Sequence, residues 1–164
     1  MREVTGSLFE LPCDALCVTT NGFVNSAGAN TMGKGCAGEA KYRYPGVQLV
    51  VGERVQRYGN HVFLLTDQIE MGEWVLYTPE GWTNHILPKA LISFPTKEHW
   101  RNPSILKLIE QSAEELLGLT QAFQFESVLI PRPGCGCGGL DWNKDVRPML
   151  DGILDDRFTA VTFR

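Results

Sequence analysis

The sequence predicts an α/β fold: a three-layer α/β/α sandwich around a mixed central sheet. Apolar segments typical of buried strands alternate along the 164 residues with segments of helical composition, as in a sheet covered by helices. Two glycine-rich segments, residues 33–35 and 134–139, each follow a predicted strand and precede a predicted helix. No Pro/Ser-rich linker, repeat or low-complexity stretch divides the chain, so we expect one domain over residues 1–164.

The predicted strands are short apolar runs bounded by turn residues. Residues 15–19 are almost continuously apolar, as expected of a strand covered on both faces, and Asn21-Gly22 ends the run. Residues 90–94 lead into Pro95-Thr96-Lys97, and open α/β sheets bind their ligands at such strand ends. The full set of predicted strands comprises residues 3–5, 15–19, 61–65, 74–77, 90–94, 127–130 and 160–163, the last of which completes the sheet.

The predicted helices are bounded by glycine, proline and capping residues. Helical composition extends over residues 36–44, and a Pro-Gly pair separates it from an amphipathic segment over residues 47–58. Asn102-Pro103, a capping residue followed by proline, predicts the start of a longer helix whose apolar residues recur at helical spacing. A last helix is predicted from about Asp145, with Pro148 in its first turn.

The two glycine segments are candidates for binding an anion. Glycine lets the backbone approach a ligand closely, and successive N–H groups at a helix N-terminus suit phosphate. Two such segments, with Lys97 between them in the sequence, favour a diphosphate held between them. The alternative is that the glycines serve turns alone.

Composition limits the classes of function. The net charge of −4 argues against broad capture of nucleic acid but leaves open a local contact with single-stranded DNA. An odd number of cysteines without a C-x-x-C pair favours reduced thiols, so we expect neither a metal site nor a cofactor. No leader pattern and no apolar stretch near the ~20 residues that span a bilayer is present, which predicts a cytoplasmic protein without membrane contact. We expect a monomer.

Five short motifs together resemble those of a known protein family. They are Gly6-Ser7-Leu8-Phe9, Thr20-Asn21-Gly22-Phe23-Val24-Asn25, Met32-Gly33-Lys34-Gly35-Cys36-Ala37, Pro131-Arg132-Pro133-Gly134-Cys135-Gly136 and Gly139-Leu140-Asp141-Trp142. The family is the macrodomains, which bind ADP-ribose and often remove it from a carrier, and the similarity covers nearly the whole chain. Thr96-Lys97 followed by Trp100 and Arg101 is most similar to the branch of the terminal ADP-ribose protein glycohydrolase and the DNA ADP-ribosyl glycohydrolase antitoxins. That branch uses a lysine at the position of Lys97.

The resemblance implies a ligand and a set of site residues. The ligand is ADP-ribose or an ADP-ribosylated carrier, with its diphosphate between the glycine segments and its distal ribose facing Asn25 and Lys97, which take the catalytic roles. Amide groups of Asn21 and Asn25 can bind ribose hydroxyls, and the alternative is that both residues serve only the turns beside Gly22 and Gly28. The implied ADP-ribose-binding residues are Ser7, Leu8, Asn21, Asn25, Gly33, Lys34, Gly35, Cys36, Ala37, Thr96, Pro133, Gly134, Cys135, Gly136, Cys137, Gly138, Gly139 and Leu140.

Lys97 has two possible roles. A lysine amine is normally protonated at neutral pH, so a nucleophilic Lys97 needs surroundings that favour its neutral form, such as partial burial or the nearby His99 and Arg101. The amine could then attack the anomeric carbon of a ring-opened ribose, and water would release ADP-ribose. Alternatively, a charged Lys97 pairs with a phosphate.

The sequence departs from the family at two positions. Ser7 stands where many macrodomains carry an aspartate that binds adenine, and Gly138 stands where the protein-directed glycohydrolase carries an assisting aspartate. Asp141 could replace the second carboxylate or could cap the following turn. The loop cysteines Cys36, Cys135 and Cys137 could have lowered thiol pKa values near helix N-termini and backbone donors, but a role as small packing residues explains them more simply.

Three functions follow from these residues. The first is a hydrolase that removes ADP-ribose from DNA or protein. The others are a non-catalytic reader of ADP-ribose and a hydrolase of a small derivative such as O-acetyl-ADP-ribose. Four tryptophans, Trp74, Trp82, Trp100 and Trp142, could stack on adenine or on a carrier nucleobase, although such residues more often belong to the core.

Overall fold

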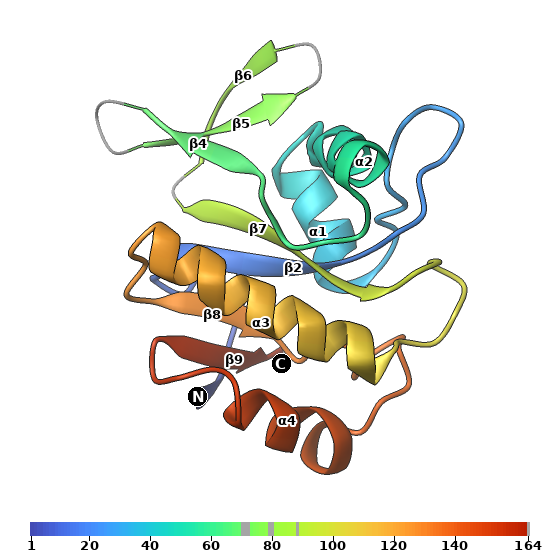
Figure 1. Ribbon diagram of the computed structural model, residues 1–164. Helices are drawn as coiled ribbons and strands as arrows, with labels where there is room; N and C mark the ends of the chain where they lie inside the picture. Colours follow the sequence, from blue (N-terminus) through green and yellow to red (C-terminus); the bar gives the residue numbers. More distant parts are fainter. Residues whose placement is uncertain (70–72, 79–80, 88, 164) are drawn as a thin grey trace.

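The protein is a central sheet with helices packed on both faces (Figure 1). The computed structural model describes residues 1–69, 73–78, 81–87 and 89–163. The sheet has six strands in the order β1-β9-β8-β2-β7-β3, and β3 alone among them pairs antiparallel to its neighbour, so the sheet is mixed as predicted. Its strands are β1 (Arg2–Thr5), β2 (Ala15–Asn21), β3 (Phe63–Leu64), β7 (Ala90–Lys97), β8 (Val128–Pro131) and β9 (Phe158–Thr162).

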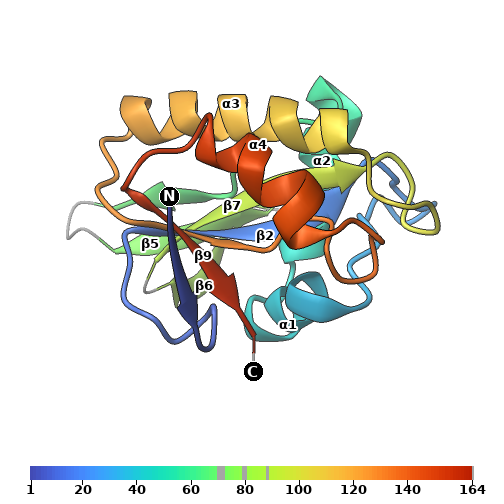
Figure 2. The same ribbon diagram turned by 90° about the horizontal axis from the view of Figure 1, so that it is seen from below.

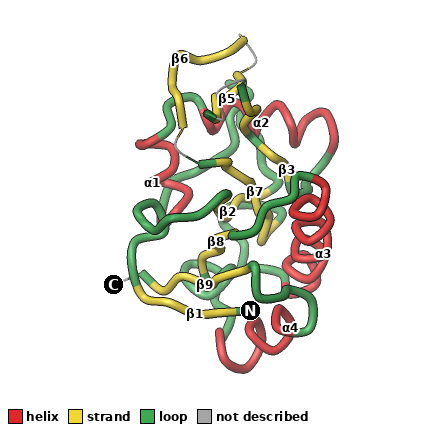
Figure 3. Tube along the Cα trace, turned by 90° about the vertical axis from the view of Figure 1, so that its left-hand side faces the viewer, coloured by secondary structure: helices red, strands yellow, loops and turns green. Residues whose placement is uncertain are grey.

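The helices form the two outer layers. They are α1 (Gly35–Arg43), α2 (Val47–Tyr58), α3 (Leu106–Ala122) and α4 (Arg147–Asp151), with a π-helical turn, Trp142–Val146, before α4. Figure 2 shows α3 and α4 on one side of the sheet and α1 on the other, and Figure 3 shows the strands between these layers. The three-layer α/β/α prediction is therefore confirmed.

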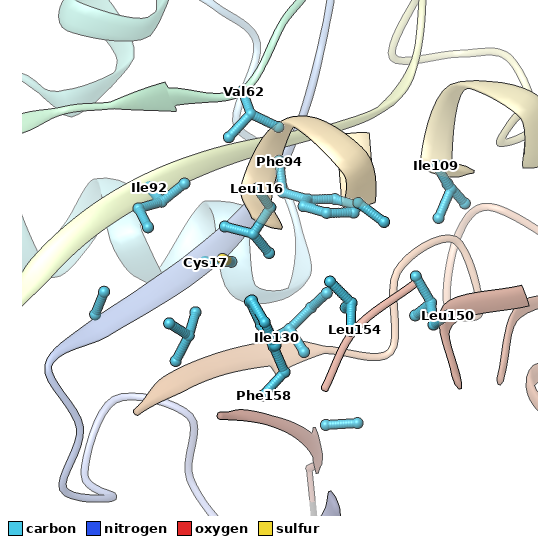
Figure 4. Packing of buried hydrophobic residues seen from close by; sticks show 14 of the residues in the cluster. Cys17, Val62, Ile92, Phe94, Ile109, Leu116, Ile130, Leu150, Leu154 and Phe158 are labelled. Atoms are coloured by element: carbon cyan, nitrogen blue, oxygen red, sulfur yellow. The ribbon is translucent and has the colours of Figure 1, made fainter. Parts of the chain in front are cut away.

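Side chains of the central strand β2 alternate between two cores. Cys17 belongs to the core beneath α3 and α4, whereas Leu16 and Val18 belong to the core beneath α1 and α2. Figure 4 shows part of the first core, where Phe94 and Leu116 pack beside Cys17. This burial on both faces explains the apolar run that marked β2 in the sequence.

The predicted start of the third helix at Asn102-Pro103 is wrong. Helix α3 begins at Leu106, and residues 99–105 form a loop. Ser104 N donates to Gly138 O (2.9 Å) and Ile105 N donates to Thr96 O (2.9 Å), so this segment is tied to the second glycine segment and to β7. Long-range hydrogen bonds therefore override the local capping signal.

Other elements differ in extent from the prediction. The strand predicted at residues 61–65 shortens to β3, and the final strand β9 lies inside the sheet, between β1 and β8. Pro148 does occupy the first turn of α4, as predicted. β4 (Thr66–Gln68), β5 (Trp74–Thr78) and β6 (Gly81–Leu87) form a separate antiparallel sheet. Of these three strands, the sequence predicted only β5. None of the described helices combines the length and apolar content that crossing a membrane requires.

Glu115 ties α3 to the beginning of β3. Its carboxylate accepts from Val62 N (2.8 Å) and Gln111 Nε2 (2.9 Å) and lies 2.7 Å from His61 Nδ1. Burial opposes ionisation of this carboxyl, but the hydrogen bonds from Gln111, Val62 and His61 outweigh it and lower the pKa of Glu115 from its ordinary value.

We predict that Glu115→Ala lowers the free energy of unfolding by about 1–2 kcal/mol at pH 7, because several hydrogen bonds are lost. Since the folded pKa lies below the unfolded value, the stabilisation is present above the ordinary glutamate range and is lost as pH falls through the folded pKa. Urea unfolding of wild type and variant should therefore give a difference in the free energy of unfolding that becomes smaller as the pH is lowered. Glu114→Ala, an exposed neighbour, is the control, and a pH-independent difference would contradict this account.

Candidate functional site

Three parallel strands end at one edge of the sheet and frame a cleft. β8, β2 and β7 are adjacent and parallel, so their carboxyl ends lie together. The β2–β7 register shifts after Thr20, which sets Asn21 opposite Lys97 at the strand ends. The cleft at this edge has a volume of about 1330 Å³.

The first glycine segment leads from Met32 into the N-terminus of α1. Gly35 has a φ of +58°, a conformation that favours glycine. Within the described chain, the N–H groups of Gly35 and Cys36 donate to no backbone carbonyl, and both residues line the cleft. The start of this helix thus presents free donors to the cleft.

Asn21 holds the chain that leads into the first glycine segment. Its Nδ2 donates to Thr31 O (2.9 Å), and its Oδ1 accepts from Phe23 N (3.0 Å). Asn30 Nδ2 in turn donates to Asn21 O (2.7 Å). The buried Asn21 therefore has a structural role in turn formation, even though it also lines the cleft.

The second glycine segment, residues 134–139, forms a tight loop after β8. Gly134 and Gly139 have φ values of +77° and +79°, and Leu140 N donates to Gly134 O (3.0 Å). A Cβ at Gly138 would overlap Ser104 Oγ and Gly134 O, so this position accepts no side chain in this conformation. The loop therefore has no room for a carboxylate side chain at position 138. The N–H groups of Gly136 and Cys137 have no acceptor among the described residues.

Glu3 on β1 anchors both sides of the second glycine segment. Its Oε1 accepts from Arg132 Nη2 (3.0 Å) and from Trp142 Nε1 (2.7 Å), and its Oε2 lies 2.7 Å from Arg147 Nη1. The Arg132 guanidinium also lies 5.1 Å from the centroid of the Trp142 ring. Because Arg132 precedes the loop and Trp142 follows it, one carboxylate fixes the two ends.

Most residues implied by the resemblance meet in the cleft. Ser7, Asn25, Pro133 and Gly139 are not among its lining residues. The implied residues that line it are Leu8, Asn21, Gly33, Lys34, Gly35, Cys36, Ala37, Thr96, Lys97, Gly134, Cys135, Gly136, Cys137, Gly138 and Leu140.

Asn25 lies in an exposed turn. Its Oδ1 accepts from Ala27 N (2.9 Å) and Ala29 N (3.1 Å), which is the turn chemistry that the sequence left as an alternative. Nδ2 is the side-chain group that this geometry leaves for a ligand. A role for Asn25 in ribose binding stays a prediction.

Lys97 lies between the two loops in space as well as in sequence. It is the last residue of β7, and its Nζ is 3.4 Å from Cys137 O of the second loop. Its backbone carbonyl accepts from Gly22 N (3.0 Å) and Asn60 Nδ2 (3.1 Å), which fixes the strand end beside β2. The amine therefore faces the cleft from a rigid main chain.

The cleft carries more available cations than anions. Lys34, Lys97 and Arg101 line it, and no described carboxylate forms an ion pair with any of them. Two described carboxylates line it: Glu39 is paired with Arg43 at 2.8 Å, and Asp141 accepts from Lys144 N at 2.8 Å. This balance favours an anionic ligand although the chain as a whole is acidic.

Asp141 acts as a cap. Its Oδ1 accepts from Lys144 N (2.8 Å) at the start of the π-helical turn, and its own N donates to Asp145 Oδ2 (2.9 Å). Capping was the simpler of the two roles expected for this carboxylate, and the geometry supports it.

The loop thiols are not activated. Burial raises the pKa of Cys36, against hydrogen bonds from Thr19, and burial raises the pKa of Cys135 to about 11, against the opposing charge of Arg132. Desolvation therefore outweighs any lowering of these two pKa values by a helix N-terminus, the less favoured of the two interpretations of the sequence. Packing explains these residues better than nucleophilic chemistry.

The sequence analysis missed several residues that line the cleft. Ser104 lines the cleft because the loop before α3 is tied to Gly138, and Phe163 lines it at the end of β9. Both depend on long-range packing.

The tryptophans differ in their surroundings. Trp142 is buried, and the ring centroids of Trp74 and Phe125 lie 5.8 Å apart, while the side chain of Trp82 lies outside the described residues.

We predict that Gly138→Ala lowers the free energy of unfolding by about 2 kcal/mol, because the added methyl group overpacks the loop. Gly136→Ala is the matched control, since a Cβ there meets no atom within 4 Å and its φ is not in the left-handed region. Thermal or urea unfolding of the two variants measures the difference. Equal stability of both would contradict the packing described here.

We predict that iodoacetamide at pH 8 labels the exposed Cys137 at least about tenfold faster than Cys36 or Cys135, because thiolate is the reactive species and raised pKa values suppress it. Labelling of Cys36 and Cys135 should accelerate as pH rises toward 11. Peptide mass spectrometry with Cys137→Ser as control measures the rates. Preferential labelling of Cys36 would contradict this assignment.

Comparison with known proteins identifies relatives over most of the chain. A DNA ADP-ribosyl glycohydrolase of Thermus aquaticus is 31% identical over 155 residues, covering 94% of this chain and 38% of the relative. One from Mycobacterium tuberculosis is 33% identical over 138 residues, covering 84% of this chain and 36% of the relative. This chain thus spans somewhat more than a third of the length of these relatives.

Solved structures and a family profile agree with these matches. The macrodomain of Mycobacterium tuberculosis DarG superposes with a TM-score of 0.73 at 30% identity, covering 99% of this chain and 95% of that one. The profile of the Macro domain family matches residues 24–149, which include both glycine segments and Lys97. The chain therefore belongs to the Macro domain family.

Proposed function

We propose that this protein binds ADP-ribose in the cleft and removes it from a modified carrier, which we infer to be DNA. The observation that carries the proposal is the meeting of two loops with free N–H donors and one lysine amine in a single cleft. A diphosphate offers acceptors to the N–H groups of both loops, and Lys34 and Lys97 supply complementary charge.

The ligand takes its orientation from the two loops. With the diphosphate between residues 33–36 and 134–137, one ribose lies toward Lys97 at the end of β7. Clefts for small ligands commonly hold roughly 300–1,000 Å³, so this larger volume also has room for part of a carrier.

The proposed chemistry uses Lys97 as a nucleophile. The neutral amine attacks the anomeric carbon of the distal ribose, the bond from that carbon to the carrier breaks, and the carrier leaves with a proton. The bond from the anomeric carbon to the ring oxygen then breaks, the ring oxygen takes the proton from the lysine nitrogen, and an imine joins Lys97 to the open ribose. Water then adds to the same carbon, the lysine bond breaks, and the amine and ADP-ribose are released. The sum is the carrier conjugate plus water giving the free carrier plus ADP-ribose.

DNA is the carrier we propose. Relatives that match most of this chain are named DNA ADP-ribosyl glycohydrolases. The second loop supports this choice, because the glycine at position 138 leaves no place for the carboxylate of the protein-directed enzymes. Non-catalytic binding of ADP-ribose and hydrolysis of a small derivative are the competing outcomes of the test.

We predict that wild-type protein releases ADP-ribose from ADP-ribosylated single-stranded DNA and that Lys97→Ala loses at least about 100-fold in rate, since covalent catalysis disappears. Lys97→Arg keeps the charge but not the nucleophile, so it should be equally impaired. Lys107→Ala, an exposed lysine on α3, is the control.

Trapping with borohydride tests the covalent step. Wild type incubated with substrate and borohydride should carry a reduced adduct on the peptide that contains Lys97, and its mass gain should be that of ADP-ribose less one oxygen atom, because the imine forms with loss of water and then gains two hydrogens. Full activity of Lys97→Arg would assign the lysine to charge stabilisation instead. Binding of ADP-ribose without turnover of any conjugate would make the protein a reader, and turnover restricted to small derivatives would overturn DNA as the carrier.

A further inference from the structure

The turn after Lys97 carries a stack of aromatic and cationic side chains, here called the rim stack: Phe23, His99, Trp100 and Arg101. The Phe23 and His99 rings meet edge to face with centroids 4.5 Å apart, and the His99 and Trp100 rings stack at 5.7 Å. The Arg101 guanidinium carbon lies 4.6 Å from the centroid of the Trp100 ring. Trp100 and Arg101 both line the cleft.

Hydrogen bonds fix the rim stack relative to the site. Asn102 N donates to His99 O (3.0 Å), and Arg101 N donates to His99 Nδ1 (3.2 Å). Farther along the loop, Ser104 N reaches Gly138 O of the second glycine segment. The turn is therefore held between Lys97 and the second loop, next to the position proposed for the reacting bond.

Trp100 and Arg101 are available to a ligand. Trp100 is 40% exposed, in contrast with Trp142, which is 5% exposed. Arg132 and Arg147 are paired with Glu3, whereas Arg101 has no ion pair among the described side chains. Trp100 thus keeps a large exposed surface in addition to its contacts with His99 and Arg101, and the Arg101 guanidinium has no carboxylate partner among the described side chains.

We propose that Trp100 and Arg101 bind the carrier as a nucleobase of single-stranded DNA. The modified base packs against the indole and guanidinium, and Arg101 pairs with an adjacent phosphate. Aromatic rings and arginine planes bind unstacked bases in this way, and a base inside a duplex could not reach them. The inference rests on the proposed function, because that function places the bond between the distal ribose and the carrier beside Lys97, and the carrier lies on the far side of this bond.

The test compares binding of an ADP-ribosylated single-stranded oligonucleotide with binding of free ADP-ribose. Lys97→Ala protein is used throughout so that substrate is not consumed. Adding Trp100→Ala should weaken oligonucleotide binding about tenfold or more, as loss of a base–aromatic stack does. The affinity for free ADP-ribose should stay within about twofold of that of the Lys97→Ala protein. Trp100→Phe should retain most of the affinity, and Arg101→Ala should reduce it and flatten its salt dependence.

Tyr42→Ala and Arg57→Ala are the matched controls, because both side chains are exposed away from the lining residues. Equal affinity for the oligonucleotide and for free ADP-ribose would overturn the inference, as would an equal loss of both in Trp100→Ala. A Trp100-dependent preference for an ADP-ribosylated protein over the oligonucleotide would also overturn it. If wild type fails to release ADP-ribose while Trp100-dependent oligonucleotide binding remains, the hydrolase proposal fails and this inference stands.

Discussion

The parallel pairing of β2 with β7 and β8 is the constraint on which the cleft depends. It brings to one sheet edge the chain that leads to the first glycine loop, the end of β7 with Lys97, and the beginning of the second loop. Burial of β2 on both faces holds this alignment, because slipping its register by one residue would exchange the side chains of the two cores. The core thus determines where the ligand-binding groups lie.

In our proposal, recognition of the ligand in this cleft relies on main-chain groups more than on side chains. Gly35, Cys36, Gly136 and Cys137 line the same cleft, and none of their N–H groups donates to a backbone carbonyl among the described residues. The second loop is packed so closely at Gly138 that a carboxylate is excluded. Chemistry that other macrodomains divide between a lysine and an aspartate therefore falls, in our proposal, to Lys97 and its surroundings.

Local sequence patterns predicted the elements that depend on residues close together in the chain, such as apolar runs and turn residues. The apolar runs of β2, β7 and β8, the helices α1 and α2 and the position of both glycine loops could be read directly. The start of α3 could not be predicted in this way, because it depends on contacts outside the helix. Ser104 N donates to Gly138 O, which is distant in sequence, and Ile105 N donates to Thr96 O in β7. The raised pKa values of Cys36 and Cys135 likewise depend on burial that no motif reveals.

Calorimetric titration with ADP-ribose, ADP and AMP tests the central claim most directly. If both loops hold a diphosphate and the distal ribose lies toward Lys97, ADP-ribose should bind at one site per chain, ADP more weakly and AMP most weakly. Equal affinity for ADP-ribose and AMP, or no binding of any of the three, would contradict the assignment of the cleft.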